Sequence, residues 1–150
     1  MLSLNFKAYK FNTKEAEGNT RIFDIVRKKY VLLTPEEWVR QNVIHYLVED
    51  VGVPAGLISV EKAIVFNDLT RRFDICVAGR NGQLMLLVEC KAPNVQLTQK
   101  TLMQISVYQK VLGVKFLFIT NGVNHLFLLA EDSSIPPVQL PELPHYSLWT

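Results

Sequence analysis

The sequence predicts an α/β domain built on a mixed β-sheet flanked by helices, and three observations lead to this fold class. Asn81 and Gly82 stand between two apolar runs, a pattern typical of a tight β-hairpin. Residues 34–50 and 97–112 have the capping residues and apolar spacing of helices. Another apolar run, residues 114–120, follows the second helix. A strand, a helix and a strand in one sheet form a right-handed crossover, so two strands of the sheet should be parallel neighbours.

The hairpin gathers three charged side chains at one end. Its two runs, residues 73–77 and 84–88, are apolar on both faces, as in a buried central sheet. If the Asn-Gly dipeptide forms a two-residue type I′ turn, Asp74 lies directly opposite Glu89, with Cβ atoms about 4.5–5.5 Å apart. Two carboxylates this close repel each other, so replacing either with alanine should slightly stabilise the metal-free protein. Lys91 follows Glu89 by two residues and is expected on the same face.

The first helical segment begins with a capping pattern. Thr34 is the expected N-cap, Pro35 takes the first helical position, and Glu37 stands three residues after the cap, as in a capping box. An apolar stripe continues to about residue 50. One interpretation of Glu37 is therefore that it satisfies free N–H groups at the start of the helix.

The second helical segment is bounded by Thr98, a suitable N-cap, and Gly113, which is typical of a helix C-terminus. Gln104 and Tyr108 are four residues apart and share one face of this helix. Taken alone, they would be a solvent-facing pair beside an apolar stripe.

The other segments carry weaker signals. We expect an edge strand at residues 1–11, a loop at 12–20 and extended structure with a basic turn at 21–33. Residues 57–65 should form a strand, and residues 67–72 a connection. The basic turn, residues 27–29, is either a solvated turn or a contact for phosphate groups. The four prolines within residues 131–150 exclude a helix or a central strand there. We expect residues 1–150 to form a single domain with this proline-rich tail at its end. The tail is expected to pack along the domain, to contact a partner or to lead to further modules.

Composition excludes several classes of protein. With 49% apolar and 20% charged residues, the chain is an ordinary globular sequence and not a disordered one. A net charge of +2 is too small to indicate nucleic-acid binding by itself. The sequence has no apolar run for a membrane span and no signal-peptide pattern at residues 1–11. Cys76 and Cys90 fall on opposite faces of the hairpin, and two unpaired thiols fit a cytoplasmic protein.

Asp74, followed by Glu89, Cys90 and Lys91 at a strand end, resembles the core motif of the PD-(D/E)xK nuclease superfamily, an Asp and then Glu-x-Lys. Phe73 stands where the proline of that name would be, at a position that varies in the superfamily. The resemblance implies a restriction-endonuclease-like core. It also implies a metal-dependent deoxyribonuclease that hydrolyses phosphodiester bonds.

Gln104 and Tyr108, one helix later, match the Q-x-x-x-Y motif of the RecB-like branch of this superfamily. In particular, residues 22–129 resemble the nuclease domain at the N-terminus of type I restriction enzyme R subunits. The resemblance implies that Gln104 and Tyr108 support the site or the DNA strand. In this family an acidic residue of the first helix often reaches the metal. Glu37 is the candidate for that role and Glu36 the alternative, beside the capping interpretation.

The family resemblance implies a Mg²⁺ site. Asp74 and Glu89 would hold the ion, which prefers oxygen ligands, and the carbonyl of Cys90 would add another ligand. Mn²⁺ is expected to substitute for Mg²⁺. Lys91 would either orient the attacking water or stabilise the phosphate in the transition state.

DNA is the partner that the resemblance implies. Arg71 and Arg72 directly precede Asp74 and are candidates for phosphate contacts, since a guanidinium matches phosphate with two hydrogen bonds. Alternation along the strand favours Arg72 as the one on the face of Asp74. A type I-like domain would depend on a separate translocase in a restriction-modification complex. Two alternatives stay open: a RecB-like nuclease for single-stranded or branched DNA, and a catalytically silent DNA-binding or assembly module of the same fold.

Overall fold

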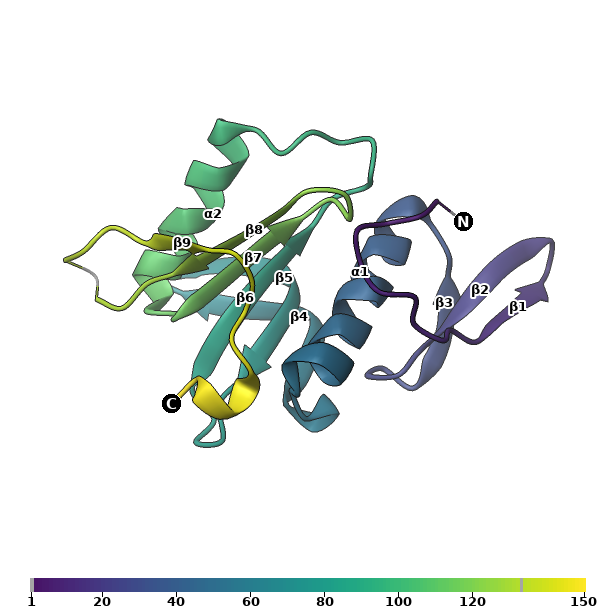
Figure 1. The fold of residues 1–150 in the computed structure, drawn as a ribbon, viewed down its shortest axis with the longest axis horizontal. Helices are drawn as coiled ribbons and strands as arrows, with labels where there is room; N and C mark the ends of the chain where they lie inside the picture. Colours follow the sequence, from purple (N-terminus) through teal and green to yellow (C-terminus); the bar gives the residue numbers. More distant parts are fainter. Residues whose placement is uncertain (1, 133) are drawn as a thin grey trace.

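The structure, a computed structural model, describes residues 2–132 and 134–150 and has the mixed α/β architecture expected (Figure 1). The strands are β1 (Thr13–Ala16), β2 (Asn19–Asp24), β3 (Lys29–Leu32), β4 (Ile58–Phe66), β5 (Leu69–Ala78), β6 (Leu84–Cys90), β7 (Phe116–Thr120), β8 (His125–Leu129) and β9 (Val138–Leu140). The helices are α1 (Pro35–His45), its π-helical continuation η1 (Tyr46–Val51), α2 (Gln99–Leu112), and the 3-10 turns η2 (Ala55–Leu57) and η3 (Tyr146–Leu148).

The strands form two sheets. Strands β1 to β3 make an antiparallel three-stranded sheet, and β4 to β9 make a six-stranded sheet in sequence order. Within the larger sheet β6 and β7 are parallel, as the crossover through α2 predicts, and the other neighbours are antiparallel. The fold class predicted from the sequence is thereby confirmed.

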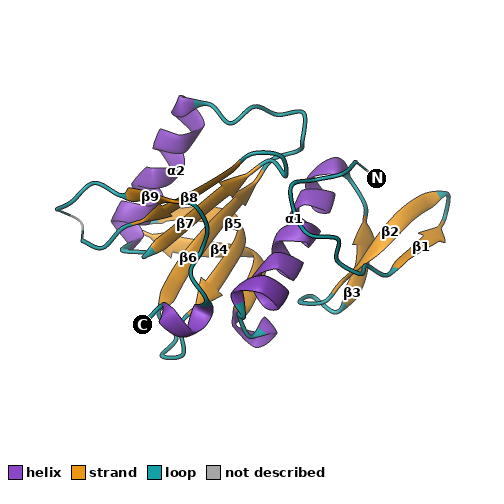
Figure 2. Ribbon diagram, viewed as in Figure 1, coloured by secondary structure: helices purple, strands orange, loops and turns teal. Residues whose placement is uncertain are grey.

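The two long helices cover opposite faces of the six-stranded sheet (Figure 2). On one face Val39, Val43 and Ile44 of α1 enter the larger apolar core. On the other face Ile105 of α2 packs into a second core with Phe73 of β5. Figure 1 shows α1 between the six-stranded sheet and the three-stranded sheet, so this helix borders both. No helix of the described residues is long and apolar enough to cross a membrane.

Both helices start and stop where the sequence predicts. The hydroxyl of Thr34 accepts a hydrogen bond from the backbone N–H of Glu37 at 3.1 Å, and Thr98 does the same for Thr101 at 3.2 Å. Gly113 ends α2 with φ of 64°, a left-handed conformation that glycine adopts without strain.

The β5–β6 hairpin does not have the predicted two-residue turn. The N–H of Gly82 donates to the carbonyl of Gly79 at 2.9 Å, which places Arg80 and Asn81 at the centre of a longer loop. Only Gly82 of this loop has positive φ, at 84°, whereas a type I′ turn would require it at Asn81 too. The side chain of Asn81 accepts a hydrogen bond from the N–H of Gln83 at 3.0 Å and stabilises the longer loop.

The hairpin register is nevertheless the predicted one. The register shifts between Val77 and Ala78, where β6 contains one extra residue, Met85. This β-bulge offsets the extra residue of the loop, so Ile75 lies opposite Val88 as the shorter turn would have placed it. Two deviations from the expectation therefore cancel before the strands reach Asp74 and Glu89.

Two-residue turns with positive φ at both positions occur elsewhere in the chain. Glu17 and Gly18, with φ of 55° and 78°, join β1 to β2. Asn67 and Asp68, with φ of 48° and 62°, join β4 to β5. The expectation of a loop at residues 12–20 and a connection at 67–72 was wrong, because the strand ends beside these turns are polar and exposed and lack an apolar alternation.

Residues 2–11 do not form the predicted edge strand. The indole N–H of Trp38 donates to the carbonyl of Leu2 at 2.8 Å, and the N–H of Asn5 donates to the carbonyl of Gly122 at 2.7 Å. The segment therefore lies as an irregular strap over α1 and the β7–β8 turn, because its backbone pairs with these elements and not with a strand.

The proline-rich tail packs along the domain, which was one of its expected arrangements. Strand β9 pairs with β8 at the edge of the sheet, where proline-flanked strands are tolerated. Trp149 is 1% exposed and its ring centroid lies 5.0 Å from that of Phe116. Its indole N–H donates to the carbonyl of Pro144 at 2.9 Å. The tail thus closes the larger core on the face that α1 covers.

Candidate active site

Asp74 lies at an irregular point of β5. Phe73 packs into the core under α2, whereas Ile75 packs into the core under α1, so two residues that should share a face point to opposite sides. The backbone N–H of Cys90 donates to Oδ2 of Asp74 at 2.8 Å. The end of β6, which also carries Glu89, therefore fixes the orientation of the Asp74 carboxylate.

Glu89 is a buried carboxylate with few neighbouring groups that stabilise its negative charge. Its exposed fraction is 6%, and within the described part of the chain its Oε1 accepts no hydrogen bond. Burial, and next the charge of Asp74, raise the pKa of Glu89 from 4.5 to about 7, while the charges of Arg71 and Lys91 act in the opposite direction. The repulsion between the two carboxylates that the sequence predicts is thus the second cause of this shift, after burial.

Arg71 lies beside one of the two carboxylates, Glu89. Its Nη2 lies 3.5 Å from Oε1 of Glu89, and its guanidinium lies 4.8 Å from the ring centroid of Tyr108 and 5.3 Å from that of Phe73. Arg72 is exposed. The alternation of β5 breaks between Phe73 and Ile75, so Arg71 is the arginine that reaches Glu89, and the phosphate contact expected of Arg72 stays a prediction.

The two residues of the Q-x-x-x-Y motif, Gln104 and Tyr108, lie in different surroundings. Tyr108 packs edge-on against Phe66 and Phe73 and supplies a ring face to Arg71, so it is connected to Glu89 through that arginine. Gln104 is exposed on α2. The structure therefore links one member of the motif to the site.

Arg40 of α1 is the principal partner of Asp74 and was not anticipated from the sequence. Its Nη2 donates to Oδ1 of Asp74 at 2.8 Å, and its Nη1 donates to Oε1 of Glu37 at 2.8 Å. Burial favours a lower pKa for Arg40, but the hydrogen bond to Asp74 and the charge of Glu37 outweigh it and raise the pKa. Arg40 therefore stays charged and joins the two acidic residues.

The capping interpretation of Glu37 holds for its backbone and not for its carboxylate, and its role toward a metal ion stays a prediction. Its backbone N–H takes part in the helix cap, whereas its carboxylate turns inward and accepts hydrogen bonds from Arg27 at 3.0 Å, from Arg40 at 2.8 Å and from Gln41 at 3.2 Å. It reaches Asp74 through Arg40. The alternative residue, Glu36, lies 3.5 Å from Arg40 through its Oε1.

Arg27 of the basic turn is a structural residue in this fold. Its Nε donates at 2.7 Å to Asp24, a fully buried carboxylate that also accepts from Gln41 at 2.9 Å. Burial alone would raise the pKa of Asp24, but the hydrogen bonds from Arg27 and Gln41 lower it. Lys28 and Lys29 of the same turn are exposed.

Lys91 follows the last residue of β6 and is partly exposed. Its backbone N–H donates to the carbonyl of Thr120 at 2.9 Å, which extends the pairing with β7 past the strand end. Its charge contributes to lowering the pKa of Glu89, so the side chain belongs to the same electrostatic environment.

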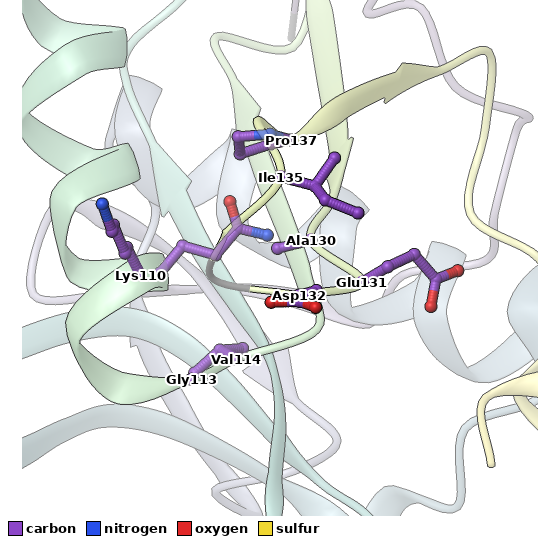
Figure 3. A pocket seen from close by; sticks show the side chains of 9 residues that line it. Lys110, Gly113, Val114, Ala130, Glu131, Asp132, Ile135 and Pro137 are labelled. Atoms are coloured by element: carbon purple, nitrogen blue, oxygen red, sulfur yellow. The ribbon is translucent and has the colours of Figure 1, made fainter.

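A separate cavity of about 110 Å³ lies between the end of α2 and the segment after β8 (Figure 3). Lys110, Ala130 and Ile135 are among the residues that line it. The predicted site residues are absent from its lining in the described chain. The candidate site residues on β5 and β6 therefore lie outside the lining of this cavity.

Comparison with known proteins assigns the family. The family model described as type I restriction enzyme R protein N terminus matches residues 35–144, which is most of the chain. The chain belongs to this family. The match to the R protein N terminus begins at the first residue of α1 and covers both helices and the whole six-stranded sheet, with β1 to β3 preceding it.

A solved structure supports the fold of this R protein N-terminal domain. It is described as a fragment of an HsdR subunit of a type I restriction enzyme from Vibrio vulnificus YJ016. The TM-score is 0.52 and the sequence identity is 21%, over 77% of this chain and 24% of that chain. This chain therefore spans about a quarter of the length of that protein. A search of curated proteins gives no match.

Proposed function

We propose that this R protein N-terminal domain hydrolyses phosphodiester bonds of DNA with a divalent metal ion, as a PD-(D/E)xK nuclease of the RecB-like branch. The observation that carries the proposal is the pair of carboxylates on adjacent strands, Asp74 on β5 and Glu89 on β6, with Lys91 directly after β6. Family membership supports a restriction-related function on DNA.

Two carboxylates fit Mg²⁺ or Mn²⁺, which prefer oxygen ligands and retain waters. Oε1 of Glu89 is buried without a hydrogen-bond partner among the described residues, and a cation would compensate it. The described residues hold no group of three or more His, Cys, Asp or Glu side chains suited to a metal. The ion would therefore rely on Asp74, Glu89, the carbonyl of Cys90 and water.

The residues around the ion would have separate tasks. A bound ion would polarise the phosphate and activate a water molecule. The N–H of Cys90 holds the Asp74 carboxylate in a fixed orientation. Lys91 orients the attacking water or stabilises the phosphate. Tyr108 supports Arg71, which lies beside Glu89. Once the metal ion compensates the charge of Glu89, Arg71 becomes a candidate for a phosphate contact.

Phosphate contacts outside the site would come from exposed cations. Arg72 is exposed next to Arg71, and Lys28 and Lys29 are exposed next to Arg27. Arg27 itself is bound to Asp24 and Glu37, so it is unsuited to this task. These contacts would give affinity that is independent of sequence and sensitive to salt.

Incubation of supercoiled and linear DNA with the protein tests the proposal, with Mg²⁺, Mn²⁺ or EDTA in parallel. We expect cleavage with either metal and none with EDTA. Asp74→Asn should abolish it. Asp68→Asn is the matched control, since Asp68 is exposed in a turn whose positive φ asparagine tolerates. Absence of any metal-dependent cleavage, with DNA binding retained, would favour the silent binding or assembly module.

The RecB-like alternative is separated by the substrate. Preference for single-stranded or branched DNA over duplex DNA would support it. The protein would depend on a restriction-modification complex if it cleaved linear duplex DNA only after a type I translocase was added.

A further inference from the structure

We propose that Arg40 is the resident counter-cation of Asp74 and that it yields this carboxylate to the metal ion. The inference rests on the metal-dependent function proposed above. Nη2 of Arg40 donates to Oδ1 of Asp74 at 2.8 Å, while the N–H of Cys90 donates to Oδ2 at 2.8 Å. The side chains of Arg40 and Asp74 are 9% and 13% exposed. Each oxygen of the expected metal ligand thus already has a strong donor.

The Arg40–Asp74 pair and a metal ion at Asp74 are competing interactions. A guanidinium keeps its charge at any accessible pH, so Arg40 cannot give way by losing a proton. A divalent ion at Oδ1 would lie next to this charge, and like charges in contact repel strongly where little water screens them. Arg40 must therefore move when the ion binds.

Arg40 has other acceptors within reach. Its Nη1 is already 2.8 Å from Oε1 of Glu37 and 3.9 Å from Oε1 of Glu61. Its Nη2, the atom that binds Asp74, is also 3.5 Å from Oε1 of Glu36. A small shift of the guanidinium toward Glu36 would break one contact and shorten another. Release of Asp74 therefore leaves no unpaired charge on Arg40, which is the usual obstacle to opening a buried ion pair.

This arrangement makes Arg40 a positioning residue that acts through Asp74. In the metal-free protein it offsets the charge of Asp74 and, together with the N–H of Cys90, fixes the position of the Asp74 carboxylate. Its presence also weakens metal binding, because the ion must displace it. Arg40 thereby sets the metal concentration at which the site fills.

Calorimetric titration with Mn²⁺ at pH 8 tests the proposal on the wild-type protein, Arg40→Met and Arg27→Met. Arg27 is the matched control, because it also contacts Glu37, at 3.0 Å, and Glu61, at 3.7 Å, while its third ion-pair partner among the described residues is Asp24 and not Asp74. Arg40→Met should bind Mn²⁺ at least tenfold more tightly than the wild type. Arg27→Met removes a positive charge from two of the carboxylates that Arg40 also contacts, Glu37 and Glu61, and should show no such gain. Equal or weaker binding by folded Arg40→Met would overturn the proposal.

A second measurement uses the unaltered protein, because Arg40 is buried, Arg27 is largely buried, and their variants can fail to fold. In nitrogen-15 NMR spectra, the guanidinium signals of Arg40 should move as Mg²⁺ is added, and those of Arg27 should stay. An Arg40 signal that is unchanged at metal saturation would refute the role of Arg40 and leave the nuclease proposal intact. Absence of metal binding by both the wild type and Arg40→Met would refute the metal-dependent function itself.

Discussion

Glu89→Gln should stabilise the metal-free protein at alkaline pH and remove most of its pH dependence. The pKa of Glu89 is raised from 4.5 to about 7, chiefly by burial and then by the charge of Asp74. A carboxyl group with a higher pKa in the folded state holds its proton more tightly there. The free energy of unfolding therefore falls as pH rises from about 4.5 to about 7, and is level above that. At about 1.4 kcal/mol for each pKa unit, the full loss is roughly 3.5 kcal/mol.

Urea unfolding at pH 5 and pH 8.5, with EDTA present, measures this loss. The wild type should lose up to about 3 kcal/mol between the two pH values, a large share of the roughly 5–15 kcal/mol of a typical domain. Glu89→Gln should lose much less and exceed the wild type at pH 8.5. Glu142→Gln, at an exposed position, is the control and should behave as the wild type. A wild-type stability that does not change with pH would show that Glu89 is ionised in the fold and that Arg71 compensates it.

The remaining predictions concern four other side chains. Asp74→Ala should lower the metal-free stability by about 1–3 kcal/mol in urea unfolding, because it removes the hydrogen bond from Arg40 and leaves the buried N–H of Cys90 without its acceptor; a gain in stability would support the simpler repulsion argument made from the sequence. Tyr108→Phe should cleave DNA at the wild-type rate while Tyr108→Leu should be slower, since the ring face supports Arg71; equal rates would remove that support from the mechanism. Trp149→Ala should cost about 3–5 kcal/mol of unfolding free energy, and a cost below about 1 kcal/mol would show that the tail is peripheral. Arg72→Ala should weaken DNA binding in Ca²⁺ and reduce the slope of log affinity against log salt by about one, and an unchanged slope would place the DNA elsewhere.

The helices and the crossover could be predicted because their signals are local. Thr34 and Thr98 cap the helices through bonds to residues three positions on, and Gly113 ends α2 by its own conformation. The parallel pairing of β6 and β7 follows from the handedness of the connection and needs no knowledge of distant contacts.

The partners of the carboxylates could not be predicted because they depend on distant segments and on backbone irregularity. Arg40 and Asp74 are 34 residues apart, and only the packing of α1 on the sheet brings them together. A weak signal existed within α1, since Glu37, Arg40 and Gln41 stand at helical spacing on one face. The break in alternation at Asp74, which turns Arg71 toward Glu89, has no counterpart in the residue pattern.

The loop between β5 and β6 has one residue more than a two-residue turn. The bulge at Met85 offsets the change in register that this extra residue would cause. Changes of length at the tip are thus absorbed within the first few residues of the strands. Deleting one loop residue would be matched by straightening the bulge, and the register farther along would survive. The tip can therefore change in length while the base of the hairpin, which carries Asp74 and Glu89, keeps its register.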